Sequence, residues 1–278
     1  GFVVRLTVLS LVGQAAIATW PTRVVMPWLC LERCPSNESS ILANIQQVTG
    51  HAHELGAASF EAFDVGDEGQ LRWNHFRDVH KDLTAAGLRT FPMLTTVNIS
   101  RIRTLLADPT RLISEAVDLA VRNNYTGWNV DFECSGGDSK DARLYTSFIH
   151  SFATKLHAHG KLLSVDLGRS LIICKDHEAP WNFKDVAKTA VDFVITMDTY
   201  ATELSEFLDG LAYGLETAGP KLGVGLSTMK LETMQPFSQE EMQARFAALE
   251  AHGVKQVDIW QAPLPDFWWP LLEQYRRS

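Results

Sequence analysis

Apolar runs typical of β-strands alternate with helical runs along most of this 278-residue chain. This alternation constrains the fold more than any other feature of the sequence. Strands are predicted at residues 23–31, 58–65, 90–95, 128–133, 162–167, 193–197, 222–226 and 256–260. Helices are predicted where apolar residues recur at helical spacing, at 41–55, 76–86, 112–121, 144–156 and 241–251. Strands that alternate with helices form a parallel sheet covered by those helices.

Glycines mark the ends of helical runs just before the next strand. They are Gly56, Gly87, Gly160, Gly219 and Gly253, and glycine readily adopts the left-handed conformation that ends a helix. Helix starts are predicted where Asp108 precedes Pro109 and where Ser238 and Glu241 can form a capping box. This number of strand–helix units predicts a single-domain (β/α)8 TIM barrel. A doubly wound sheet is the alternative, but no glycine-rich phosphate loop follows the first strand.

Composition and charge narrow the partners. The chain is 46% hydrophobic, which is enough for a large core, and its formal net charge is -8 with scattered basic residues. Nucleic acid is therefore not an expected partner. We expect no cofactor and a monomer.

The first 18 residues have the form of a secretory signal peptide. Arg5 precedes an apolar run over Leu6–Ile17, and residues 16–18 read Ala-Ile-Ala, which resembles a cleavage site. The barrel would then occupy residues 19–278, with no membrane attachment after cleavage. The alternative is that Phe2–Val12 is a buried strand or helix. Glycosylation motifs begin at Asn37, Asn98 and Asn124 and fit a secretory route.

Cysteine pairing is a related expectation. Four cysteines allow three pairings in an oxidising compartment. We favour Cys30 with Cys34, which can bridge one tight loop, and Cys134 with Cys174, which must meet through the fold. A metal site is not expected, because no histidine has ligand-like spacing from a cysteine pair.

The segment Gly127–Glu133 carries the clearest chemical signal. If it is a strand, Asn129, Asp131 and Glu133 project from one face while Val130 and Phe132 project from the other. Buried carboxylates are costly unless hydrogen-bonded or paired, so such a row indicates a site with tuned pKa values. One ionised carboxylate can raise the pKa of the other and keep it a general acid. The alternative is an edge strand whose polar face meets water.

A barrel would place other candidates beside Glu133, because active sites of such barrels lie at the carboxyl-terminal ends of the strands. The candidates follow or end the predicted strands and are Asp64, Asp166, Met197, Asp198, Tyr200, Trp260 and Gln261. Each has a structural alternative: Asp64 could cap a turn, Met197 could be core, and Trp260 could fill the barrel. Sugar-stacking aromatic side chains could come from Trp73, Trp181, Trp268 and Trp269.

The stretch from Thr126 to Glu133 resembles the Asp-Gly-x-Asp-x-Asp-x-Glu signature on strand 4 of glycoside hydrolase family 18, the chitinase family. Asn129 in place of the central acid is most similar to the di-N-acetylchitobiase branch, as are the cysteines after strands 4 and 5. The Asp166 strand and Trp260 are further matches. Thr126 departs from the signature, and the segment from Met197 to Tyr200 is one residue longer than the family's Met-x-Tyr motif.

The resemblance implies cleavage of β-1,4-linked N-acetylglucosamine oligosaccharides with retention of configuration, in which the substrate's own acetamido group is the nucleophile. Glu133 would be the acid and base, Asp131 would orient the acetamido group, and Asn129 would anchor Asp131. Tyr200 or Asp198 would take the place of the family tyrosine. Substrate contacts would come from Asp64, Asp166, Met197, Trp260 and Gln261.

Two other functions remain open, as do substrate length and destination. A chitinase-like barrel could bind amino sugars without cutting them, or Glu133 and Asp198 could hydrolyse another sugar as a carboxylate pair. The short segment from Ser227 to Lys255 has no room for the α+β insertion of many chitinases, which implies a short substrate. A lysosomal or extracellular location is expected.

Overall fold

Eight parallel strands close into a barrel in the computed structural model, which describes residues 23–31, 37–74, 78–134, 136–168 and 181–278. Their order is β1-β11-β8-β7-β6-β5-β4-β2, and pairing of β1 with β2 closes the ring. Their bounds are β1 Val24–Leu29, β2 Ala57–Val65, β4 Arg89–Thr96, β5 Gly127–Phe132, β6 Leu162–Leu167, β7 Phe193–Thr196, β8 Leu222–Ser227 and β11 Gln256–Trp260. The predicted (β/α)8 barrel is confirmed, and all eight predicted strands are present.

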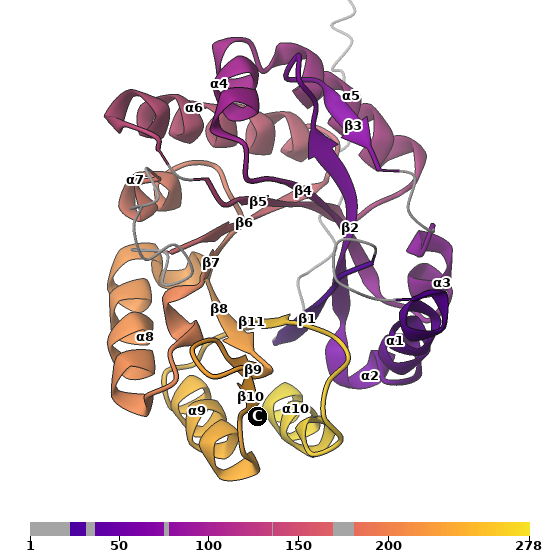
Figure 1. Ribbon diagram of the computed structural model, residues 1–278, viewed down its shortest axis with the longest axis vertical. Helices are drawn as coiled ribbons and strands as arrows, with labels where there is room; N and C mark the ends of the chain where they lie inside the picture. The colour runs from indigo at the N-terminus through magenta and orange to yellow at the C-terminus, as the bar shows by residue number, and fades with distance from the viewer. Residues whose placement is uncertain (1–22, 32–36, 75–77, 135, 169–180) are drawn as a thin grey trace, which may run out of the picture.

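Helices surround the barrel and cover the outer faces of its strands (Figure 1). Their bounds are α1 Glu38–Gly50, α2 Ala52–Leu55, α3 His80–Ala85, α4 Ile99–Ala107, α5 Thr110–Arg122, α6 Ser139–His157, α7 Phe183–Ala187, α8 Leu204–Ala218, α9 Gln239–Ala251 and α10 Trp268–Arg277. The main core lies between strands and helices, where outward residues such as Trp128, Val130 and Phe132 are buried. Apolar residues of alternate strand positions therefore stabilise the outside of the barrel.

The five helix-ending glycines all have positive φ, although Gly219, with a ψ of -125°, lies outside the left-handed helical region. Gly56, Gly87, Gly160, Gly219 and Gly253 have φ values of 108°, 84°, 66°, 54° and 65°. At α9, Ser238 and Glu241 form the predicted capping box. At α5, Asp108 Oδ1 accepts from the backbone N–H of Thr110 at 3.1 Å, but the helix begins at Thr110, so Pro109 precedes its first residue.

Some helices differ from the prediction. The run 41–55 is divided into α1 and α2 at His51, whose ring stacks on Trp269 with centroids 3.7 Å apart. Helices α4, α7 and α10 were not predicted, and of α8 only the end at Gly219 was predicted. Helix α8 contains Gly210 and Gly214, which lower helix propensity but allow close packing. A Cβ on Gly210 would lie 3.1 Å from the Asp198 carbonyl oxygen.

The segment between β8 and β11 contains only the hairpin of β9, Met229–Lys230, and β10, Gln235–Pro236, followed by α9. The predicted absence of an α+β insertion is confirmed for this segment. The expected signal peptide lies outside the described residues. None of the helices described is long and apolar enough to cross a membrane. Both predicted cysteine pairs have one member, Cys34 or Cys174, outside the described residues, so both pairings stay predictions.

Candidate active site

Strand β5 presents Asn129 and Asp131 to the barrel interior, and Glu133 follows at its carboxyl-terminal end. β5 lies between β4 and β6, so the edge-strand alternative is wrong. Asn129 is fully buried, whereas Asp131 and Glu133 are half-buried. The row of polar side chains thus runs from the closed interior toward the mouth, as the sequence alternation predicts.

Asn129 is the centre of a buried hydrogen-bond network that connects four strands. Its Oδ1 accepts from Trp28 Nε1 and from Ser59 Oγ, each at 3.2 Å, and its Nδ2 donates to Ser164 Oγ at 2.8 Å. These partners belong to β1, β2 and β6. A neutral amide can both donate and accept in this way, whereas an ionised carboxylate can only accept. Asn129 therefore fixes the floor beneath Asp131.

Two further carboxyl groups are buried inside the barrel. Asp166 on β6 is 2% exposed and Asp258 on β11 is 0% exposed. Burial raises the pKa of Asp166 well above its usual range; the charges of Asp131 and Asp258 raise it further, while the nearby Asn129 amide lowers it. Burial also raises the pKa of Asp258 well above its usual range, opposed by a hydrogen bond from Gln256. Both groups therefore favour the neutral form more strongly than an exposed carboxyl group does.

Tyr200 lies on the short 3-10 helix η1, Asp198–Tyr200, directly after β7. Burial raises the pKa of its hydroxyl well above the usual value, and the charges of Asp166, Asp131, Glu133 and Asp258 raise it further. The hydroxyl therefore shares the interior space with these acids. Its ring packs against the backbone of Gly225, where a side chain would not fit: a Cβ there would be 2.9 Å from Tyr200 Cε1.

Asp198, the alternative to Tyr200, begins the same 3-10 helix. Its backbone N–H donates to Thr196 Oγ1 at 3.3 Å, and its backbone lies against Gly210 of α8. Asp198 is buried, with 7% exposure. The closely packed glycines of α8 and β8 thus fix the whole turn that carries both candidates.

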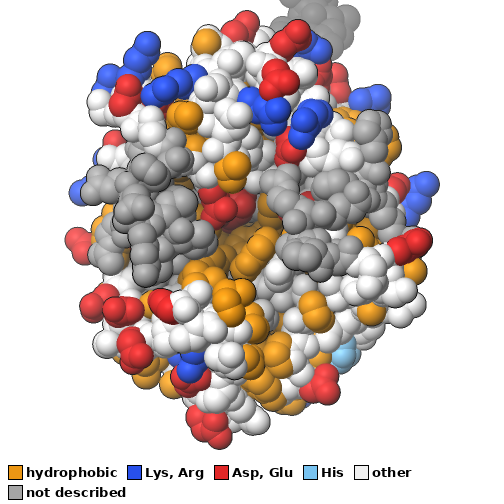
Figure 2. Space-filling model, in the orientation of Figure 1, with side chains coloured by type: hydrophobic (Ala, Val, Ile, Leu, Met, Phe, Trp, Pro, Cys, Tyr) orange, Lys and Arg blue, Asp and Glu red, His pale blue; other side chains and the backbone are white. Residues whose placement is uncertain are grey.

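An apolar cluster forms one wall of the same interior. It contains Trp28, Met93, Ile195, Met197 and Tyr200, with Trp260 packed against it. The Trp28 and Trp260 rings are 6.2 Å apart. In the space-filling view, a hollow opens at the centre of this face with hydrophobic side chains along it and acidic side chains at its edge (Figure 2). Met197 and Trp260 therefore contribute to packing as well as to the surroundings of the acids.

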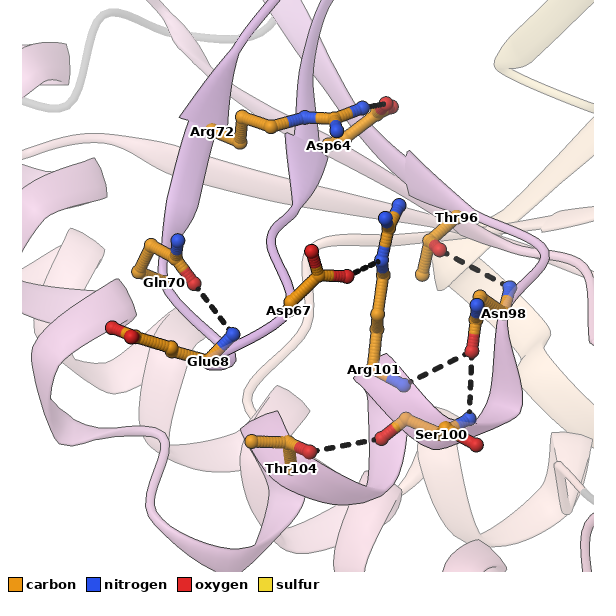
Figure 3. Close-up of polar contacts among 10 residues, drawn as sticks. All are labelled: Asp64, Asp67, Glu68, Gln70, Arg72, Thr96, Asn98, Ser100, Arg101 and Thr104. Atoms are coloured by element: carbon orange, nitrogen blue, oxygen red, sulfur yellow. Dashed lines mark hydrogen bonds and ion pairs between the residues drawn. The ribbon is translucent and has the colours of Figure 1, made fainter.

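Asp64 lies on β2 and not in a turn after it. A bulge between Glu61 and Phe63 shifts the register, so Asp64 pairs with Thr95 and Thr95 with Asp131. Asp64 is thus on the row of Asp131, two strands away. Its Oδ2 is 2.5 Å from Arg72 Nη2 on β3, Leu71–Trp73. Figure 3 shows this ion pair at the hairpin.

The hairpin is also tied to α4. Figure 3 shows Arg101 beside Asp67, with Arg101 Nε 2.7 Å from Asp67 Oδ1. Asn98 caps the same helix, because its Oδ1 accepts from the backbone N–H groups of Ser100 and Arg101. The β2–β3 hairpin is therefore fixed to the helix that follows β4, at the edge of the candidate site.

The segment after Glu133 is held from two sides. Trp181 Nε1 donates to the carbonyl oxygen of Phe132 at 2.7 Å, and Arg103 Nη2 lies 2.8 Å from Asp141 Oδ2. The hydrogen bond from Arg103 lowers the pKa of the Asp141 carboxyl. Arg103 also donates to the Gly136 carbonyl oxygen at 3.3 Å. These contacts fix the backbone on both sides of Glu133.

The remaining candidates do not all gather at this site. Gln261 follows β11 and is half-buried. Trp181 is buried against Tyr145 with ring centroids 4.1 Å apart, while Trp268 and Trp269 belong to α10 on the outside of the barrel. Trp73 on β3 is 52% exposed. In the described residues, no group of three or more His, Cys, Asp or Glu side chains is arranged to hold a metal ion.

Sequence reasoning missed several interior residues. They are Trp28, Ser59, Ser164, Gln256 and Asp258. Alternation could have found them, because Gln256 and Asp258 share a strand face with Trp260, and Ser164 shares one with Asp166. The same period that identified the β5 row therefore applies to its neighbours.

No protein-family model and no curated protein sequence matches this chain. Solved structures do: a chitinase from Chromobacterium violaceum has a TM-score of 0.75 at 13% identity, over 92% of this chain and 99% of that one. The spore cortex-lytic enzyme SleL of Bacillus megaterium has a TM-score of 0.75 at 14% identity, over 91% and 74%.

A third similar structure was solved with a sugar. It is a mutant of catalytic domain 2 of the Ostrinia furnacalis Group II chitinase in complex with penta-N-acetylchitooctaose, with a TM-score of 0.69 at 11% identity over 90% of this chain and 94% of that one. At these identities the likeness shows a common fold. The chain has the barrel fold of chitinase catalytic domains.

Proposed function

We propose that this chain is a retaining glycosidase that hydrolyses β-1,4-linked N-acetylglucosamine oligosaccharides by a substrate-assisted mechanism. The observation that carries the proposal is the position of Glu133: it follows β5 at the carboxyl-terminal end of the barrel, two residues beyond Asp131 on the same interior row. Barrels of this architecture hold their active sites at that end. The similarity of the fold to chitinases supports the same substrate class.

Glu133 supplies the proton that the reaction needs. Its carboxylic acid protonates the glycosidic oxygen while the acetamido carbonyl oxygen of the substrate attacks the anomeric carbon, so the leaving sugar departs and a cyclic oxazolinium intermediate forms. Glu133, now a carboxylate, takes a proton from the water that attacks the same carbon. Two inversions give net retention, and the protein forms no ester with the sugar.

Asp131 and Tyr200 orient the acetamido group. The Asp131 carboxylate accepts a hydrogen bond from the N–H of the substrate's acetamido group and stabilises the positive charge that develops on the intermediate. Tyr200 is favoured over Asp198 as the partner of the acetamido oxygen, because the tyrosine hydroxyl shares the interior with Asp131 and Glu133. The Asn129 network keeps the floor of this site rigid.

The substrate is a short oligosaccharide or a chain end. Only the β9–β10 hairpin and α9 separate β8 from β11, so no added domain deepens the groove. Resemblance to the di-N-acetylchitobiase branch at Asn129 fits a short substrate. We also propose that the protein acts as a monomer after entry into the secretory pathway, in lysosomes or outside the cell.

The test compares wild type with Glu133→Gln on aryl glycosides of N-acetylglucosamine and of glucose. We expect the variant to lose about 100-fold or more in kcat, because a general acid is removed. Equal rates on the two sugars would favour a carboxylate pair such as Glu133 and Asp198 over substrate assistance. Binding of chitooligosaccharide without cleavage by wild type would instead favour a lectin-like barrel.

A further inference from the structure

Asp166 occupies a position in the barrel that the proposed reaction leaves without a role. Strands β5 and β6 are neighbours, with Val130 paired to Val165, so Asp131 and Asp166 follow one residue later on adjacent strands. Adjacent parallel strands lie about 4.8 Å apart, and residues in register project to the same face. On the other side, Asp166 pairs with Ile195 of β7, which is apolar. Asp131 is therefore its lateral polar neighbour.

The oxygens of Asp166 lack the donors that an ionised carboxylate requires. Both are buried without a well-formed hydrogen bond from the described part of the chain, although the Asn129 amide lies close enough to lower the pKa of Asp166. One residue pair deeper, the Asn129 Nδ2 group donates to Ser164 Oγ. The titratable groups that face Asp166 are Asp131 from β5, Glu133 just after it, Asp258 from β11, Tyr200 from η1 and Tyr145 from α6. None of these carries positive charge.

A carboxyl group in this setting favours the neutral acid, because burial of a charge without a cationic partner is strongly unfavourable. As an acid it has one O–H to donate. Ile195 cannot accept it, whereas the carboxylate of Asp131 can, and hydrogen bonds to ionised acceptors are the strong ones. The two carboxyl groups then hold one proton and one negative charge between them.

We propose that Asp166 is a positioning residue: as a neutral acid it donates a hydrogen bond to the Asp131 carboxylate and holds that carboxylate ionised and oriented toward the acetamido group. This inference rests on the proposed function for its catalytic consequence. It also assigns Asp166 a role other than direct contact with substrate. The pair would stay singly charged while positive charge develops on the sugar.

Protonation can be tested without any activity. Infrared spectra of the full chain near neutral pH, recorded for wild type, Asp166→Asn and the buried control Asp258→Asn, separate carboxylic acid bands from carboxylate bands. We expect the carboxylic acid band of Asp166→Asn to be weaker than that of wild type. The Asp258→Asn control should also lose carboxylic acid intensity, from a different group. Loss of a carboxylate band in its place would overturn the inference whether or not the chain cleaves sugars.

The catalytic consequence needs a pair of substitutions of similar volume. Asp166→Asn keeps an N–H donor, whereas Asp166→Leu fills the same space without one. We expect kcat of the Leu variant to fall about 100-fold with little change in KM, and the Asn variant to recover most of that loss, as for removal of one preorganised donor. Equal kcat values in Asn and Leu variants would show that Asp166 only fills space.

The two proposals fail separately. An inactive wild type refutes the glycosidase, while the infrared result still decides the state of Asp166. An active wild type with an unimpaired Leu variant refutes the inference and leaves the glycosidase intact. If Asp166→Leu does not fold, the infrared comparison on Asp166→Asn remains decisive.

Discussion

The two ends of the barrel interior are built from different side chains. The amino-terminal end is filled by Val24, Met26, Ala57 and Phe91, with Leu162 packed against them. The carboxyl-terminal half contains Asp131 and Asp166, and Glu133 follows β5 at the same end. The hydroxyl of Tyr200 lies beside these acids. The same strands therefore carry apolar packing at one end and a cluster of acids at the other.

This difference teaches where stability and chemistry reside. Buried apolar groups stabilise the fold by leaving water, so the amino-terminal end supports the barrel. Buried carboxyls lower stability at neutral pH unless they stay protonated or find partners. Helix α8 and Gly225 fix Tyr200, and the Asn129 network fixes the floor, so the acidic end is held by contacts outside the acids themselves.

The largest expected effect is a loss of folding stability from a cavity at the apolar, amino-terminal end of the barrel interior. Phe91 is 1% exposed, and Phe91→Ala should lower the free energy of unfolding by about 3–5 kcal/mol, because it leaves a cavity that the barrel cannot fill. Urea denaturation measures the loss, and kcat per folded molecule should stay unchanged. The matched variant Phe91→Leu keeps most of the volume and should lose less. A stable Phe91→Ala, or one tenfold slower when folded, would contradict this division of roles.

The next effect concerns the buried acid Asp258, whose register partner on β1 is Met26 of the apolar end, and it is measured through pH. Burial raises the pKa of Asp258 well above its usual range, so the folded chain binds a proton that the unfolded chain releases above about pH 4. The stabilisation is complete below that pH and is lost as pH rises toward the folded pKa. Asp258→Asn should remove up to about 1.4 kcal/mol per pH unit from the slope of unfolding free energy between pH 5 and 8.

The measurement is a set of urea transitions at several pH values. The exposed acid Glu216 provides the control, and Glu216→Gln should leave the slope of wild type unchanged. An unchanged slope in Asp258→Asn would mean that Asp258 is already ionised in the folded chain. Asp166 should also make the free energy of unfolding fall as pH rises, because burial raises its pKa in the same direction.

The fold was predictable because its signals are local. Alternation along β5, the positive-φ glycines after the helices and the Ser238 capping box each depend on a few neighbouring residues. The span of helix α8 was missed for a related reason, although its end at Gly219 was predicted. Gly210 and Gly214 disfavour a helix locally, and only packing against Asp198 and Leu222 explains them.

The site was predictable in part. Glu133 and Asp131 follow from one strand, whereas the partnership of Asn129 with Trp28, Ser59 and Ser164 needs the order of four strands. The position of Asp64 depends on a β-bulge that the residue types in the sequence do not predict. Tryptophans could not be sorted from sequence, since Trp269 stacks on His51 outside the barrel while Trp260 packs against the interior cluster.

The smallest expected effect concerns the edge of the site, where acids are paired and partly exposed. The Arg72 side chain is 47% exposed, so Arg72→Ala should cost no more than about 1 kcal/mol of stability. Asp64 faces the row of Asp131, and Asp64→Asn should raise KM for an N-acetylglucosamine oligomer about tenfold with kcat unchanged, if Asp64 binds substrate uniformly. Arg101→Ala removes the neighbouring ion pair to Asp67 and should leave KM unchanged.

An equal rise in KM for Arg72→Ala and Asp64→Asn would show that Asp64 acts by fixing the hairpin, because contact with substrate requires only the carboxylate.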